Sequence, residues 1–581
     1  HIDGWLLNAS NVAILEVFEE KWRFVHDKLR EYLLHELRQD SENWKQHHLR
    51  AAETVETVYP DNERYIPALA HHYSEAGIID KAVPYIERAA IQIRATDQQR
   101  TVDFLNKALS YSEYDASPMQ RATWHALLQI AHYYMGNDRV SESHLKEFLR
   151  NIDAPQIPEN AFRAFSGILM QAGQQVLHRI FPQRFVGKVQ RPEFTPYMYM
   201  ALMNGTVVYQ HQGKMIQGLY ALLLSLNTVE RMQPRGRVTP TMIYGAFAYI
   251  IGMMNLHGVA GRYYRLAEES LTGDIPIIDK QTRGLLGFYH AQRAEWKDAI
   301  PLIEACVEGF DSIGDVHDSD ETRNILGRIY GHRGQMTEGY QMLAESYHRA
   351  KDRRDEVIAL SLYAGAISNL LHSGQYMAQE FDDLSLLINP DTMQELFPEG
   401  WATNPALQAG YYAVKAAYAM HSNELDEAYE ALGEAMRLLE KRSVERTLVH
   451  FDLYALIPQT CIALLRLESE SWKSDPSVKL KEWVEISIKW LGKFAGIHTS
   501  AKPRHALLSG YLSDLNQDSG AIEHWQEALR LAQELEMPYE ELLARAALYQ
   551  ATNDAGHQAE MQRLLDETGV DGDVSHFVMM K

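Results

Sequence analysis

The feature that most constrains this chain is a set of small residues that returns about every forty positions. Gly218, Ala260, Ala299 and Gly339 are 42, 39 and 40 residues apart, and apolar residues follow each of them at helical spacing. Small residues at a crossing point let two helices approach to the short end of their usual separation of roughly 8 to 10 Å. The pattern therefore predicts an all-α solenoid of helical hairpins.

The segment from Leu69 to Ile93 contains one such hairpin in full. Leu69, Tyr73 and Ala76 share one face of a first helix, which Gly77 ends. Asp80 can cap the second helix, whose apolar stripe is Ala82, Ile86, Ala89 and Ile93. The same phase returns at Gly205 to Ser225, Phe247 to Ala267, Leu286 to Cys306, Leu326 to Ser346, Ala416 to Ala435 and Leu508 to Ala528.

This pattern resembles the tetratricopeptide family from about residue 64 to about residue 566. The resemblance implies a right-handed stack of helix pairs around an inner groove, with repeats of about 40 residues in place of roughly 34. The copies between residues 98 and 190, around Gln379 and between residues 445 and 500 are weak, so their register stays open.

The expected organisation has six parts. They are the end of a winged-helix domain with connecting helices (1–50), N-terminal helical repeats (51–178), an irregular loop (179–196), central repeats (197–440), C-terminal repeats (441–566) and a tail (567–581). The loop is rich in Pro, Phe and basic residues, which is typical of a long connection between helices. Contact with a partner is the alternative interpretation.

Composition narrows the classes of function. With 56 basic and 78 acidic residues, the net charge of −22 disfavours nucleic acid and anionic membranes as partners. Only Cys306 and Cys461 are present, which favours a reducing cytoplasm over a disulfide scaffold. No apolar run approaches the roughly 18 residues of a membrane span. Because the chain begins at His1 without an initiator Met, we expect it to be part of a longer protein.

The N-terminal segment carries a second resemblance. Phe24-Val25-His26-Asp27, followed by Leu29-Arg30, is similar to the His-Asp motif that closes the winged-helix domain of signal-transduction ATPases with numerous domains (STAND), although Val25 stands where Met is usual. The resemblance implies that His26 contacts the β-phosphate of ADP. No P-loop pattern occurs in the 581 residues, so this chain has no cofactor of its own, and ADP or ATP would require an ATPase module upstream. Alternatively, His26 ends a short strand and caps a helix.

The sequence does not indicate an enzyme or a metal site. The histidines that invite a metal are His47-His48, His71-His72 and the series His257, His290 and His332. Adjacent histidines on a helix point about 100° apart, and none has a His partner four residues away, so we expect no shared metal. No Gly-x-Ser-x-Gly elbow or paired-carboxylate motif is present.

Partner binding is expected on the first helices of the central repeats, which line the groove in this architecture. Flexible Met and aromatic side chains suit an apolar peptide or helix. The candidates are Met200, Met203, His211, Met242, Tyr249, Met253 and Phe288. Burial between neighbouring repeats is the alternative interpretation.

Two functions remain open. One is the sensor arm of a nucleotide-switched signalling ATPase that forms homo-oligomers when ligand binds, and the other is a free-standing scaffold that recruits a protein or peptide.

Overall fold

The computed structural model describes residues 2–12, 14–18, 21–94, 96–188, 196–212, 214–231, 240–271, 273, 276–374, 390–398, 401, 404–440, 447–467 and 477–570. The chain forms two compact units. Unit 1 comprises His1–Ala131 and Glu147–Asp153, and unit 2 comprises His132–Lys146 and Ala154–Lys581. Helices α7 (Pro118–Tyr134) and α8 (Asp138–Asn151) contribute residues to both units.

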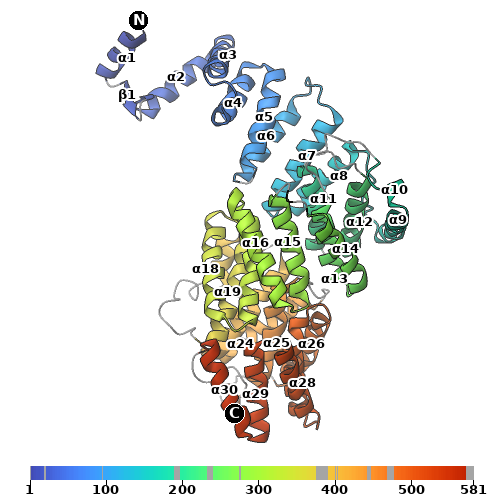
Figure 1. Ribbon diagram of the computed structural model, residues 1–581. Helices are drawn as coiled ribbons and strands as arrows, with labels where there is room; N and C mark the ends of the chain where they lie inside the picture. The colour runs from blue at the N-terminus through green and yellow to red at the C-terminus, as the bar shows by residue number, and fades with distance from the viewer. Residues whose placement is uncertain are drawn as a thin grey trace. The chain divides into compact units, whose positions relative to one another are not determined.

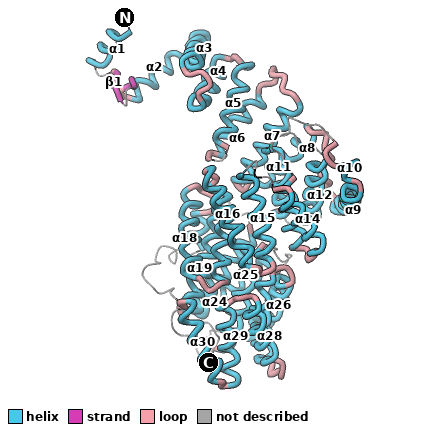
Figure 2. Tube along the Cα trace, viewed as in Figure 1, coloured by secondary structure: helices cyan, strands magenta, loops and turns pink. Residues whose placement is uncertain are grey.

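Unit 1 begins with a helix and an antiparallel hairpin of two short strands, in which Leu15 pairs with Phe24 and Val17 with Trp22. In the described part of the chain these are the only strands (Figure 2). Each of the helices from α2 to α6 packs against the next. The elements are α1 (Ile2–Asn11), β1 (Leu15–Phe18), β2 (Lys21–Phe24), α2 (Asp27–Gln39), α3 (Ser41–Val58), η1 (Glu63–Tyr65), α4 (Ile66–Ala76), α5 (Ile79–Ile93) and α6 (Gln98–Ser110).

Unit 2 is a succession of packed helix pairs, seen from green to red in Figure 1. Its first helices are α9 (Ala161–Ile180), α10 (Pro182–Phe185), α11 (Pro196–His211), α12 (Met215–Arg231), α13 (Thr241–Gly252), α14 (His257–Glu269), α15 (Pro276–Gln292), α16 (Trp296–Ile313), α17 (Val316–His332) and α18 (Met336–Asp352). The remainder are α19 (Glu356–Ser373), α21 (Pro390–Leu396), α23 (Pro405–His421), α24 (Leu425–Leu439), η3 (Leu448–His450), α25 (Phe451–Arg466), α26 (Ser477–Ala495), η4 (Thr499–Ala501), α27 (Lys502–Leu515), α28 (Ala521–Glu534), α29 (Pro538–Thr552) and α30 (Ala555–Thr568).

The recurring small residues lie where the two helices of a hairpin cross. Gly218, Ala260, Ala299 and Gly339 are buried on the second helices α12, α14, α16 and α18. Opposite Gly339 lies Gly327 of α17, and a Cβ built on Gly339 would stand 2.5 Å from the Gly327 carbonyl oxygen. Larger side chains cannot occupy such crossings without separating the helices. The predicted fold class, an all-α solenoid of tetratricopeptide-like hairpins, is therefore confirmed.

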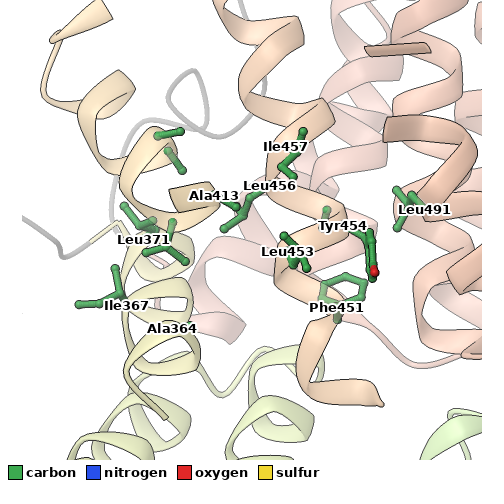
Figure 3. Close-up of a cluster of buried hydrophobic side chains, with 14 of the residues drawn as sticks. Ala364, Ile367, Leu371, Ala413, Phe451, Leu453, Tyr454, Leu456, Ile457 and Leu491 are labelled. Carbon is green, nitrogen blue, oxygen red and sulfur yellow. The ribbon is translucent and has the colours of Figure 1, made fainter. Parts of the chain in front are cut away.

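Helix α25 lies inside the hydrophobic core of unit 2. Phe451, Leu453 and Ile457 lie among aliphatic side chains of α19, α23 and α26 (Figure 3). The helical stretch Leu448–Arg466 has a mean hydropathy of 1.5 over 18 residues, and 83% of that window is buried inside the protein. The sequence prediction that no apolar run approaches membrane-spanning length was therefore wrong. A helix buried on every side is apolar all round, and we assign this one to the protein core.

The C-terminal hairpins also contact repeats more than 200 residues earlier in unit 2. The indole Nε1 of Trp296 donates a hydrogen bond to the Leu535 carbonyl at 2.8 Å, and Arg333 contacts the Glu536 carbonyl at 2.7 Å. Lys297 and Glu536 form an ion pair at 2.6 Å. These contacts hold α16 and α17 against the turn between α28 and α29.

The segment 179–196, predicted to be an irregular loop, is partly helical. Helix α9 continues to Ile180, α10 occupies Pro182–Phe185 and α11 begins at Pro196. Pro182 starts α10 because its fixed φ and missing N–H suit the first turn of a helix. Residues 189–195 of this segment and 571–581 of the predicted tail lie outside the described residues.

Candidate functional site

Helix α9 is the longest helix of the described chain, with 20 residues, and its ends are set locally. The side chain of Asn160 caps its N-terminus by accepting hydrogen bonds from the amides of Phe162, at 2.9 Å, and Arg163, at 3.2 Å. Phe181 follows its last residue, and Pro182 then begins the next helix. The helix packs against α12 and α10.

The outward face of α9 is apolar. Eight large side chains on and just beyond it are between 41% and 79% exposed, namely Phe162, Phe165, Leu169, Met170, Val176, Leu177, Ile180 and Phe181. At 3.6 residues per turn, the seven in the helix fall within about 140° of its circumference. We call these eight residues the α9 apolar face. Contiguous apolar surface of this kind marks interaction sites on soluble proteins.

The inward face of α9 is polar in its C-terminal half, which reverses the usual arrangement of a surface helix. Gln171, Gln175 and His178 are buried against α12. The Gln175 amide donates hydrogen bonds to Asn227 Oδ1 and Glu230 Oε2, each at 2.7 Å. His178 Nδ1 lies 2.7 Å from the same Glu230 oxygen.

Further bonds complete this polar network. Asn227 donates to the Gln171 side-chain oxygen at 2.6 Å, and the Tyr263 hydroxyl donates to Gln175 Oε1 at 2.5 Å. Arg179 pairs with Glu230, whose side chain is fully buried. Burial, reinforced by Arg179 and Arg231, lowers the pKa of His178 to about 4, so a neutral imidazole can donate its Nδ1–H to the carboxylate.

This network fixes which side of α9 faces out. Turning the helix to bury its apolar side would remove the partners of Glu230 and leave a buried carboxylate unpaired, which is costly.

Basic side chains surround the α9 apolar face. Arg163, Arg184 and Lys188 are exposed. No Asp or Glu occurs between Glu159 and Glu193, although the whole chain carries a net charge of −22. The face therefore combines an apolar centre with a positive rim.

The partner-binding residues predicted from the sequence lie elsewhere in unit 2. Met200 and Met203 on α11, Met242 and Tyr249 on α13, and Phe288 on α15 are half-buried. The structure brings two of them together, because the rings of Tyr249 and Phe288 are 5.7 Å apart.

Met253, at the end of α13, is only 4% exposed and offers almost no surface to a partner. Its place in the predicted groove is therefore not supported. His211 is the last residue of α11, and its side chain lies outside the described part of the structure.

His26 lies between the β1–β2 hairpin and α2. It is exposed and occupies the N-cap position of α2, but its side chain makes no capping hydrogen bond. The surrounding elements also expose large apolar side chains, namely Trp5, Leu7, Val12, Val17 and Tyr32.

Two groups of side chains in the described residues place potential metal-ligating atoms within 4.8 Å of one another. The first is His48, His71 and His72. The second is His317, Asp318 and Glu321. In the second group His317 Nδ1 is 2.5 Å from Asp355, and although burial opposes it, that carboxylate raises the His317 pKa to about 10. The Nδ1 atom of His317 is therefore already paired with Asp355, which would compete with a metal ion for it.

The α9 apolar face was not found from the sequence. Its signal is present, because Phe162, Leu169, Val176 and Ile180 recur on one side while Gln171, Gln175 and His178 recur on the other. The general rule places the apolar side inward, and only the buried partners on α12 and α14 show that this helix does the opposite.

No protein-family model and no curated protein matches this chain. Among solved structures, yeast Tom70 matches over 84% of this chain and 98% of its own, with 13% sequence identity and a TM-score of 0.29. So distant a match gives no information on function.

Proposed function

We propose that this chain is a protein-binding helical-repeat scaffold and that its α9 apolar face binds an amphipathic helix with acidic flanks. The inverted polarity of α9 carries the proposal. A helix that buries Gln171, Gln175 and His178 in paired contacts while it exposes eight large apolar side chains suits recognition better than packing.

The shape of the face suits a helical partner. A helix of 20 residues is about 30 Å long, and its stripe gives anchors at successive turns for a helix laid alongside it. Large aromatic side chains such as Phe162 and Phe165 would bury much apolar area in such a contact and are its expected anchors. The positive rim favours acidic residues on the partner and raises the association rate at low salt.

The experiment is a selection of amphipathic helical peptides from a displayed library against the full chain. We expect enrichment of peptides with acidic flanks, and binding that weakens as salt rises. The double variant Leu169→Asp/Ile180→Asp puts negative charge on the face and should weaken binding about 100-fold or more. A matched control is Val478→Asp, since Val478 is an apolar side chain of α26 that is even more open to solvent.

The same assay separates this surface from the groove predicted from the sequence. Met203→Asp replaces a half-buried side chain of α11 outside the α9 apolar face. If Met203→Asp abolished binding while Leu169→Asp/Ile180→Asp left it intact, with circular dichroism unchanged for both, the partner would bind to the central repeats and the α9 proposal would be wrong.

We also propose that the chain regulates a nucleotide-switched signalling ATPase whose ATPase and effector modules lie outside it. The exposed His26, directly after a β-hairpin and at the start of a helix, supports this, as do the exposed apolar residues around it. In a protein that carries the ATPase module, His26→Ala should raise basal activity. His35→Ala, on the same helix, is the control, and unchanged activity in His26→Ala would contradict the proposal.

A further inference from the structure

We propose that His48, His71 and His72 form a binding site for a transition-metal ion such as Zn²⁺ in unit 1. His48 comes from α3, and His71 and His72 come from α4, the helix packed against it. All three offer a ring nitrogen within 4.8 Å of the others. Imidazole is the usual nitrogen ligand for Zn²⁺ in proteins.

The spacing of two of these ligands already suits a metal. The Nδ1 atoms of His48 and His72 are 3.0 Å apart and share a hydrogen bond, whose proton a bound ion would replace. Two nitrogens bound at about 2.0 to 2.1 Å with tetrahedral geometry stand roughly 3.4 Å apart, so a small adjustment accommodates the ion.

The third histidine can reach the same point. The ring centroid of His71 is 5.3 Å from that of His48 and 5.4 Å from that of His72. Because His71 is exposed, its side chain can rotate toward the other two without displacing core residues.

The residues around the cluster can orient the site and balance its charge. Glu75 lies one turn after His71 on α4, and its carboxylate accepts a hydrogen bond from Trp44 Nε1 at 3.0 Å. The Trp44 ring lies 4.3 Å from that of His48. Two cations are also near, because Lys107 is 3.7 Å from Glu75 and Arg38 lies over the Trp44 ring. Glu75 offsets them.

This proposal departs from the sequence argument against a metal at His71-His72. The side chains of adjacent histidines on one helix diverge, and a shared metal was excluded on that ground. In the structure their ligating atoms still come within 4.8 Å of each other, and His48 of α3 offers a third nitrogen within the same distance of both. A metal at this position would link α3 to α4.

The test is titration of the full chain with Co²⁺, followed by its visible absorption, and displacement of Co²⁺ by Zn²⁺. We expect one tight site. His71→Ala and His72→Ala should each weaken binding at least tenfold, and the double variant should abolish it. His47→Ala removes an exposed histidine next to His48 and should bind like the wild type.

Circular dichroism should be unchanged for His71→Ala, because that side chain lies at the surface. A wild-type chain without a tight Co²⁺ site would overturn the proposal. So would equal binding by the wild type and the double variant, which would place the ion at other histidines.

Discussion

The buried ion pair between Arg504 and Glu540 gives the sharpest test of how the repeats of unit 2 are held together. Arg504 of α27 donates to the two carboxylate oxygens of Glu540 on α29, at 2.9 and 2.7 Å, and to Gln459 of α25 at 2.8 Å. The two charged side chains are 1% and 3% exposed. Three helices therefore meet at one guanidinium.

Glu540→Ala leaves the Arg504 guanidinium buried. Of the three hydrogen bonds just described, only the one to Gln459 remains. The variant loses two charge-assisted hydrogen bonds, each contributing about 1.5 to 3 kcal/mol. This sum of about 3 to 6 kcal/mol agrees with the roughly 3 to 5 kcal/mol lost when one member of a buried pair is removed. We expect the free energy of unfolding to fall by about 4 kcal/mol.

The assay is urea unfolding of the full chain, followed by circular dichroism. Glu534→Ala is the matched control, because it removes a carboxylate from the solvent-exposed pair with Arg530, and such surface pairs contribute little to stability. Arg504→Met/Glu540→Leu should recover most of the loss, since an apolar pair needs no counter-charge. If Glu540→Ala and Glu534→Ala lowered stability equally, the pair would not hold these helices together.

Two further predictions concern the hairpins and pH. Gly339→Ala should destabilise the chain by about 1 to 3 kcal/mol in urea unfolding, because its Cβ would stand 2.5 Å from the Gly327 carbonyl oxygen. Gly410→Ala, with no atom within 4 Å of the new Cβ, should be neutral or stabilising, and equal losses would refute the crossing argument. Burial, with Arg504, Arg328 and His498 nearby, lowers the pKa of His332 to about 3. Between pH 6.5 and 3 the unfolded chain therefore binds a proton that the folded chain does not, so stability falls as pH falls. Between pH 7 and 5 this loss is about 2 kcal/mol, and His332→Phe should remove it, whereas an unchanged pH dependence would contradict the assignment.

The hairpin repeat could be predicted because its cause is local. A helix crossing tolerates only small side chains, so Gly218, Ala260, Ala299 and Gly339 recur at a spacing that one sequence reveals. The first helix shows the same constraint at Gly287, where a Cβ would lie 3.1 Å from the Ala299 carbonyl oxygen. A local steric constraint of this kind can be inferred from the sequence without knowing which distant residues are in contact.

The buried charges could not be predicted, because their partners are distant in sequence. Arg328 pairs with Asp452, and Arg504 with Glu540, across 124 and 36 residues. Nothing in the spacing of these residues distinguishes them from surface charges. The burial of the apolar helix Leu448–Arg466 could not be predicted for the same reason, since it depends on the helices packed around it.

The histidine cluster shows a limit of reasoning from one helix at a time. The divergence of His71 and His72 is real on a helical wheel, but the ring of His48 on α3 lies near both, 5.3 Å from that of His71 and 5.0 Å from that of His72. A rule about i and i+4 partners detects sites within a helix and misses those formed between two helices.

The inverted helix α9 connects folding to recognition. Its apolar face stays outward because Glu230 holds Gln175, His178 and Arg179 on the inward side, so stability and exposure have the same cause. A partner that binds there meets a surface already in its final orientation and causes little loss of conformational entropy in this chain. It follows that Glu230→Gln should weaken peptide binding by loosening α9, although this side chain is buried beneath α9 and would not touch the peptide. Leu169→Asp should also weaken binding, but with α9 still in place. Hydrogen exchange along α9 distinguishes the two, because only Glu230→Gln should accelerate it. Fast exchange in the wild type would mean that the network does not fix the helix.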